Sequence, residues 1–115
     1  MIERLWSAGG TLLVSAVSAW EIGTLVEKGR IALDVTPDAW LREILRQPGV
    51  VGLPLDPITA LGGSALAEFT RQDPMDRLLI AVAISQDCPL VTHDAHILAF
   101  AQRYGGRYGF AAINE

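Results

Sequence analysis

The sequence has a single cysteine, Cys88, so the chain cannot form an internal disulfide. It also lacks any apolar run of the roughly 18 residues that a membrane-spanning helix needs. Its first ten residues, MIERLWSAGG, do not contain the basic and apolar blocks of a signal peptide. These absences argue against a disulfide-stabilised or membrane-spanning protein, and we expect the chain to act in the cytoplasm.

Basic residues are also few: nine Lys and Arg face thirteen Asp and Glu, a net charge of −4. Proteins that hold nucleic acid mainly through its phosphates carry a basic surface, which this composition does not provide. An acidic chain that acts on a polyanion therefore needs a cation between the two. The basic residues are scattered, with Arg71 and Arg77 nearest the segment 73–94, and we expect most of them on the solvated surface.

Half of the 115 residues are hydrophobic, which indicates one small globular domain over residues 1–115. Short apolar runs near 11–14, 51–55, 89–92 and 108–113 predict buried strands, and helical patterns separate them. This alternation predicts an α/β fold with a parallel sheet flanked by helices. We expect the preceding segment, residues 2–8, to end a helix at Gly9-Gly10.

The helices are predicted from their capping signals and apolar periodicity. A helix begins at Ser15 or Ser18 and ends at Lys28. Helices also follow Thr36-Pro37, Asp56-Pro57 and Asp73-Pro74, and the second of these extends to Phe69. A last helix over 95–103 ends at Gly105-Gly106.

Two carboxylates lie near the most apolar helix of the chain, which begins at Asp73-Pro74. Asp76 shares a helical face with Leu79 and Ile80, so its side chain points toward the core. Asp94 directly follows the strand over 89–92, at the edge where α/β sheets bind ligands. The alternative is structural: Asp76 favours a helix start, and Asp94 caps the next helix.

A third acid, Glu21, falls on the inward stripe of the first predicted helix, between Val17 and Leu25. A carboxylate that faces the core needs a partner, a proton or a metal ion. The alternative is that Glu21 only closes a capping box with Ser18.

Right-handed crossovers bring the carboxyl ends of parallel strands to one edge of the sheet, so Glu21, Asp76 and Asp94 can converge. Three adjacent carboxylates repel one another unless a hard divalent cation neutralises them. Mg²⁺ or Mn²⁺ suits such oxygen ligands. His93 and His96 beside Asp94 are only a weak zinc signal, and we interpret them instead as surface histidines or as histidines that support the site without binding the metal.

Three segments together resemble the PIN-domain ribonucleases, in particular the VapC toxins of type II toxin–antitoxin systems: Ser-Ala-Trp20-Glu21-Ile, Asp73-Pro-Met-Asp76-Arg77 and Leu-Val-Thr92-His-Asp94. The resemblance implies a three-layer PIN-like fold and a metal-dependent endoribonuclease that a cognate antitoxin neutralises. It also implies a possible homodimer.

The resemblance further implies roles for individual residues. Glu21, Asp76 and Asp94 are then the metal ligands. Thr92, Asp73 and Arg77 support the site. Arg77 steadies a phosphate or pairs with Asp73; a salt bridge on the helix surface is the alternative.

One part of the family pattern has no counterpart. PIN domains begin with a strand that carries a first acid, and the first acid of this sequence, Glu3, falls in a predicted helix. The first strand is therefore expected to be missing. This favours a second hypothesis, a catalytically impaired PIN-like module that only binds a partner protein. A phosphoacceptor receiver domain is less favoured, since a strand-end Asp with a downstream strand-end Lys is lacking.

Overall fold

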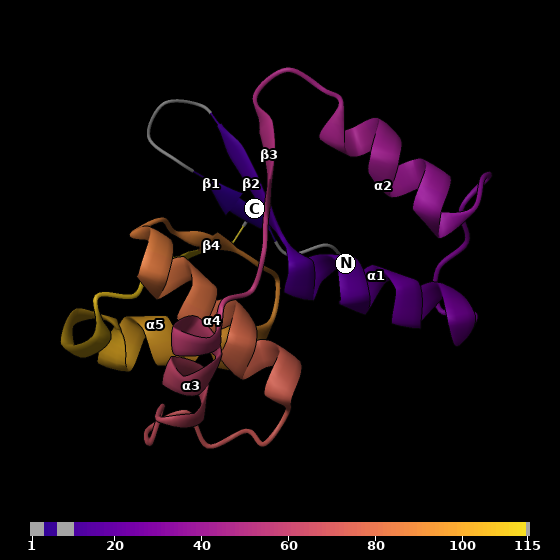
Figure 1. Cartoon of the computed structure of the whole chain (residues 1–115). Coiled ribbons are helices and arrows are strands. Elements are labelled where there is room, and N and C mark those ends of the chain that lie inside the picture. The colour runs from indigo at the N-terminus through magenta and orange to yellow at the C-terminus, as the bar shows by residue number, and fades with distance from the viewer. Residues whose placement is uncertain (1–3, 7–10, 115) are drawn as a thin grey trace.

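Strands and helices alternate along the chain largely as the sequence predicts (Figure 1). The computed structural model describes residues 4–6 and 11–114. The elements are β1 (Arg4–Trp6), β2 (Leu12–Ser15), α1 (Ala16–Glu27), α2 (Pro37–Leu45), β3 (Val50–Leu53), α3 (Pro57–Ser64), α4 (Pro74–Gln86), β4 (Leu90–Val91), α5 (Ala95–Tyr108) and β5 (Ala112–Ile113).

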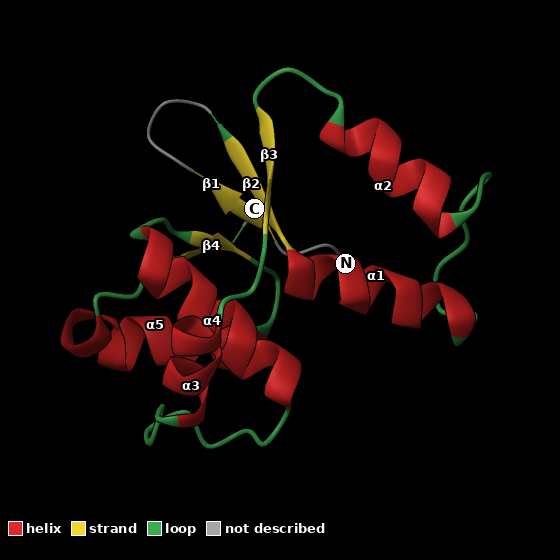
Figure 2. Ribbon diagram, viewed as in Figure 1, coloured by secondary structure: helices red, strands yellow, loops and turns green. Residues whose placement is uncertain are grey.

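The strands form one sheet in the order β3-β2-β1-β4-β5, and helices flank it (Figure 2). The pairs β2–β3 and β4–β5 are parallel, as predicted. Strand β1 lies in the middle, antiparallel to β2 and to β4. The predicted α/β class is therefore confirmed, with one antiparallel strand between two parallel pairs.

The helix predicted over 2–8 is wrong where the structure describes it, because residues 4–6 form β1. The other residues of that prediction lie outside the described part of the chain. Leu5 is paired with Leu13 on β2 and with Leu90 on β4. A strand in this position satisfies backbone groups on both neighbours, which a helix cannot do. In a sheet expected to lack its first strand, β1 occupies the position between β2 and β4.

The start of α1 agrees with one of its two predicted caps. Ser15 accepts the N–H of Ser18 at 3.1 Å, so the cap is not the alternative box of Ser18 and Glu21. Two helix ends differ from the prediction. Helix α3 ends at Ser64 and does not reach Phe69, and the chain after it turns so that Phe69 enters the core.

Helix α5 continues through both glycines that were expected to end it, and Gly109 forms its C-cap with a left-handed φ of 68°. The carbonyl oxygen of Phe110 approaches Gly105 so closely that a Cβ atom there would collide with it. Gly105 therefore serves close packing, whereas Gly109 serves the turn.

Helix α4 forms the centre of the core, as its nearly uniform apolar sequence predicts. Leu79 and Ile80 are almost fully buried, and aromatic rings of α5 and the adjoining loops pack beside them. The ring of Phe100 makes an edge-to-face contact with that of Phe69, and the ring centres lie 5.3 Å apart. Figure 1 shows α3, α4 and α5 grouped together and α2 standing apart from them. Within the described residues, we find no helix long and apolar enough to cross a membrane.

Candidate functional site

The first turn of α4 presents Asp76 as the sequence predicts. Asp73 is the N-cap and accepts the N–H of Met75 at 2.9 Å, and Pro74 occupies the first helical position. This start places Asp76 on the inward face, where only 5% of its surface is exposed. Helix α4 therefore carries a carboxylate at the border of the core.

Asp94 follows β4 and caps α5. Its Oδ1 accepts the N–H groups of His96 at 2.9 Å and Ile97 at 3.0 Å. Thr92 is buried, and its Oγ1 accepts the N–H of Asp94 at 3.0 Å. With Oδ1 committed to the cap, Oδ2 is the oxygen that accepts a hydrogen bond from Arg71.

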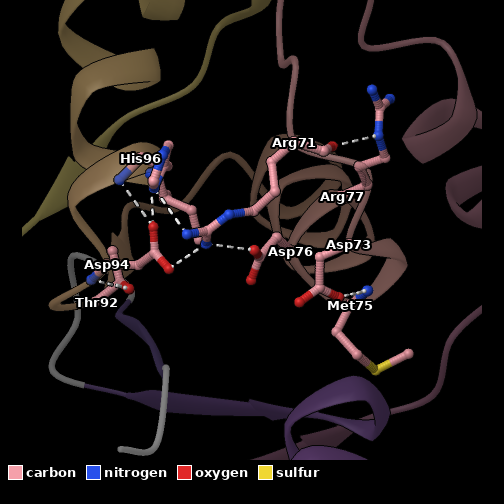
Figure 3. Close-up of polar contacts among 9 residues, drawn as sticks. Arg71, Asp73, Met75, Asp76, Arg77, Thr92, Asp94 and His96 are labelled. Atoms are coloured by element: carbon pink, nitrogen blue, oxygen red, sulfur yellow. Dashed lines mark hydrogen bonds and ion pairs between the residues drawn. The ribbon is translucent and has the colours of Figure 1, made fainter.

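Both carboxylates meet on one atom of Arg71, from the loop before α4 (Figure 3). Its Nη1 donates to Oδ2 of Asp76 at 2.8 Å and to Oδ2 of Asp94 at 2.5 Å. Its Nη2 lies 2.7 Å from Nδ1 of His96. A guanidinium has only donors, so Nδ1 of His96 is the acceptor here. Asp76 and Asp94 thus form a carboxylate pair with a shared counter-cation.

The surroundings shift the pKa values of the two acids in opposite directions. Burial raises the pKa of Asp76, and the hydrogen bond from Arg71 offsets this only in part. Burial also acts to raise the pKa of Asp94, but hydrogen bonds from Arg71 and from the backbone of α5 outweigh it, so the pKa falls below its usual range. Asp94 therefore holds its charge to lower pH than Asp76 does.

Glu21 lies on α1, in a neighbouring cleft of about 390 Å³ that Asp73 and Met75 also line. It is partly buried. Across residues 4–6 and 11–114, no three Asp, Glu, His or Cys side chains lie close enough together to hold a metal ion. The structure thus joins Asp76 with Asp94 and places Glu21 near the start of the same helix. The three-ligand set stays a prediction.

In the described part of the chain Arg77 forms no salt bridge with Asp73, and its guanidinium donates instead to backbone carbonyl oxygens. Its contact with a phosphate stays a prediction. Nε bonds to the oxygen of Arg71 at 3.2 Å, and Nη2 to that of Phe69 at 2.5 Å. Nη1 reaches the oxygens of Gly63 and Leu66, each at 3.3 Å. Arg77 therefore ties the chain between α3 and α4 to α4.

The carboxylate pair suits the metal that the sequence predicts. Two carboxylate oxygens converge on one cationic atom, and Mg²⁺ and Mn²⁺ prefer such oxygen donors. The described arrangement therefore fits a hard divalent cation between Asp76 and Asp94, with two ligands from the protein.

Arg71 is the site residue whose role the sequence did not reveal, since it was noted only as a basic residue near the start of α4. His96 was interpreted as a surface histidine or one that supports the site, in preference to a zinc ligand, and it contacts Arg71. Arg71 lies in a loop, where no periodicity indicates the direction of a side chain. The one available signal was its position five residues before a buried acid.

The chain resembles a known protein family and a known protein. The family model described as PIN domain matches residues 1–106. The chain is 35% identical over 86 residues to Ribonuclease VapC22 of Mycobacterium tuberculosis (strain ATCC 25618 / H37Rv). That alignment covers 75% of this chain and 65% of the relative, so the chain spans less than two thirds of that protein. No solved structure shows a significant match. The resemblance predicted from the sequence is confirmed, and the chain belongs to the PIN-domain family.

Proposed function

We propose that the chain is a metal-dependent endoribonuclease that hydrolyses RNA phosphodiester bonds. The observation that carries the proposal is the convergence of Asp76 and Asp94 on one cationic atom at the start of two helices. Its likeness to a protein named as a ribonuclease supports RNA as the substrate. Because the chain carries a net charge of −4, it needs a cation between its acidic site and the phosphate of a bound RNA.

Asp76 and Asp94 are the residues that would hold Mg²⁺ or Mn²⁺, and Glu21 is proposed as a third ligand from α1. A bound divalent ion supplies Lewis-acid stabilisation of phosphate charge and activation of water. The protein supplies orientation. Asp94 is held by its cap bonds to α5, Thr92 fixes the turn before it, and burial restricts the side chain of Asp76.

The proposal includes the partners that the VapC resemblance implies. A cognate antitoxin would neutralise the ribonuclease activity, and the chain would form a homodimer. The chain and its antitoxin would act in the cytoplasm. The likeness to VapC22 supports this class of protein.

A second function is a PIN-like module that binds a partner without cleaving RNA. Two observations favour it: Arg71 already supplies the carboxylate pair with a positive charge, and the described residues hold no three-ligand cluster. It predicts that the chain binds an antitoxin peptide and leaves RNA intact.

RNA cleavage by the purified chain separates the two functions. We expect cleavage with Mg²⁺ or Mn²⁺, none after EDTA, and none with Asp76→Asn. The matched control is Asp87→Asn, since Asp87 is exposed at the far end of α4 and Asn tolerates its left-handed φ of 51°. Antitoxin binding without metal-dependent cleavage would exclude the nuclease and support the module.

A further inference from the structure

We propose that Arg71 is a resident counter-cation that occupies the metal position between Asp76 and Asp94, must leave it when a divalent ion binds, and thereby sets the metal affinity of the site. This inference rests on the proposed function. It concerns what the chain itself does before a metal arrives.

The first step is that guanidinium and metal compete for the same two atoms. Nη1 of Arg71 lies 2.8 Å and 2.5 Å from the Oδ2 atoms of Asp76 and Asp94. Mg²⁺ requires oxygen ligands at about 2.0–2.1 Å, so an ion held by Asp76 and Asp94 would need the space that Nη1 of Arg71 takes. Two cations in contact would also repel each other. Occupation by Arg71 and occupation by the ion are therefore mutually exclusive.

The second step is that the guanidinium is well held. It engages two carboxylates and the Nδ1 atom of His96. Charge-assisted bonds of this kind are stronger than neutral ones, especially where one acid is buried. An incoming ion must replace them, which weakens its apparent affinity.

The third step is that the side chain can leave without unfolding its loop. The carbonyl oxygen of Arg71 is bound by Nε of Arg77 at 3.2 Å, so the backbone is tied to α4. The side chain of Arg71 remains 32% exposed. It borders a cleft of about 240 Å³ that Glu68 also lines. This cleft gives the displaced guanidinium space, although the carboxylate of Glu68 already accepts hydrogen bonds from Arg107 and Tyr108.

The test is Mg²⁺ and Mn²⁺ binding by calorimetry, without RNA, for the unmodified chain, Arg71→Gln and Arg42→Gln. Arg42 is the matched control because it also pairs with an aspartate, Asp38 at 2.9 Å, but on the surface of α2. If Arg71 occupies the site nine times in ten, its removal should tighten metal binding about tenfold. Arg42→Gln should leave binding unchanged. Equal or weaker binding by Arg71→Gln overturns the proposal.

Melting temperatures provide a second readout. Without metal, Arg71→Gln should melt below the unmodified chain because its two acids lose their counter-cation. Saturating Mg²⁺ should then raise its melting temperature by more than that of the unmodified chain. An equal or smaller rise contradicts the proposal.

If Arg71→Gln does not fold, a measurement on the unmodified chain still tests whether Arg71 leaves the carboxylates when Mg²⁺ binds. In protein with ¹⁵N-labelled arginine, added Mg²⁺ should move the Arg71 side-chain Nε–H signal toward that of free arginine and leave the Arg77 signal in place. Arg71→Lys identifies the signal by its loss. An Arg71 signal that stays unchanged while Mg²⁺ binds overturns the proposal, as does a failure of Mg²⁺ to bind.

These outcomes are independent of cleavage. Tighter metal binding by Arg71→Gln in a chain that never cuts RNA supports the counter-cation and refutes the nuclease. Metal-dependent cleavage, together with an unchanged metal affinity in Arg71→Gln, supports the nuclease and refutes the counter-cation.

Discussion

The Nε atom of Arg77 donates a hydrogen bond to the carbonyl oxygen of Arg71 at 3.2 Å. The residue next to Asp76 on α4 therefore holds the backbone of the loop that supplies the counter-cation. The same guanidinium lies over the ring of Phe69, 5.9 Å from its centre. One side chain thus joins the loop to the core beside the carboxylate pair.

Arg77→Met should destabilise the chain, because the carbonyl oxygens of Phe69 and Arg71 lose their charged donor. Leaving such groups unsatisfied costs about 1–3 kcal/mol in the free energy of unfolding. Urea denaturation measures the change, with Arg42→Met as the control for loss of an exposed arginine. An effect no larger than that of Arg42→Met would mean that the loop does not depend on Arg77.

Asp94 should show separable structural and chemical roles. Asn is a good N-cap, so Asp94→Asn should keep α5 intact while removing the charge that faces Arg71. Asp94→Ala loses both and should be less stable than Asp94→Asn by about 1 kcal/mol in the free energy of unfolding. Denaturation of the two variants measures this difference, and RNA cleavage should be lost in both. Equal stability would show that the cap contributes little.

Glu21→Gln decides whether the third acid joins the metal. If Glu21 is a ligand, its loss should weaken Mg²⁺ binding about tenfold, within the range seen when groups around a metal are removed. Calorimetry compares it with Glu27→Gln, the exposed acid at the end of the same helix. Identical affinities for both variants would leave Asp76 and Asp94 as the ligands that the protein supplies.

The two adjacent glycines of α5 should respond oppositely to alanine. A Cβ at Gly105 would collide with the carbonyl oxygen of Phe110, so Gly105→Ala should cost about 1–3 kcal/mol in the free energy of unfolding. Gly106 is exposed and has open space, so Gly106→Ala should stabilise α5 by up to about 1 kcal/mol. Thermal or urea unfolding of both variants checks the pair. Losses of similar size would argue against close packing at Gly105.

Asp56 should contribute to the pH dependence of stability. It accepts the N–H of Thr59 at 2.8 Å and the Thr59 hydroxyl at 2.9 Å, and these bonds lower the pKa of Asp56 in the folded chain. Because the folded pKa lies below the unfolded one, the stabilisation is present above the ordinary value of about 3.9 and is lost as the pH falls through the folded pKa.

Melting curves of the unmodified chain and Asp56→Asn measure this contribution. Asn retains an oxygen for the cap but does not titrate. The difference in stability between the two chains should be constant near neutral pH and should change below about pH 4. If the difference in stability between the two chains does not vary with pH, Asp56 does not contribute to the pH dependence.

The sequence by itself determined those features that depend on neighbouring residues. Asp73 and Pro74 start α4 because capping and a fixed φ act within one helical turn, and this start turns Asp76 inward. Asp94 follows β4 because a short apolar run ends there. The PIN-domain assignment rested on these local patterns.

Only the tertiary structure decided the features that depend on distant residues. Residues 4–6 form a strand because β2 and β4 offer backbone partners on both sides, and helical periodicity within the segment carries no information about them. Arg71 belongs to the site because Asp76 and Asp94, far apart in the sequence, place two negative charges within its reach. Electrostatic attraction through space acts on the folded positions of these charges, and the order of residues along a loop does not state those positions.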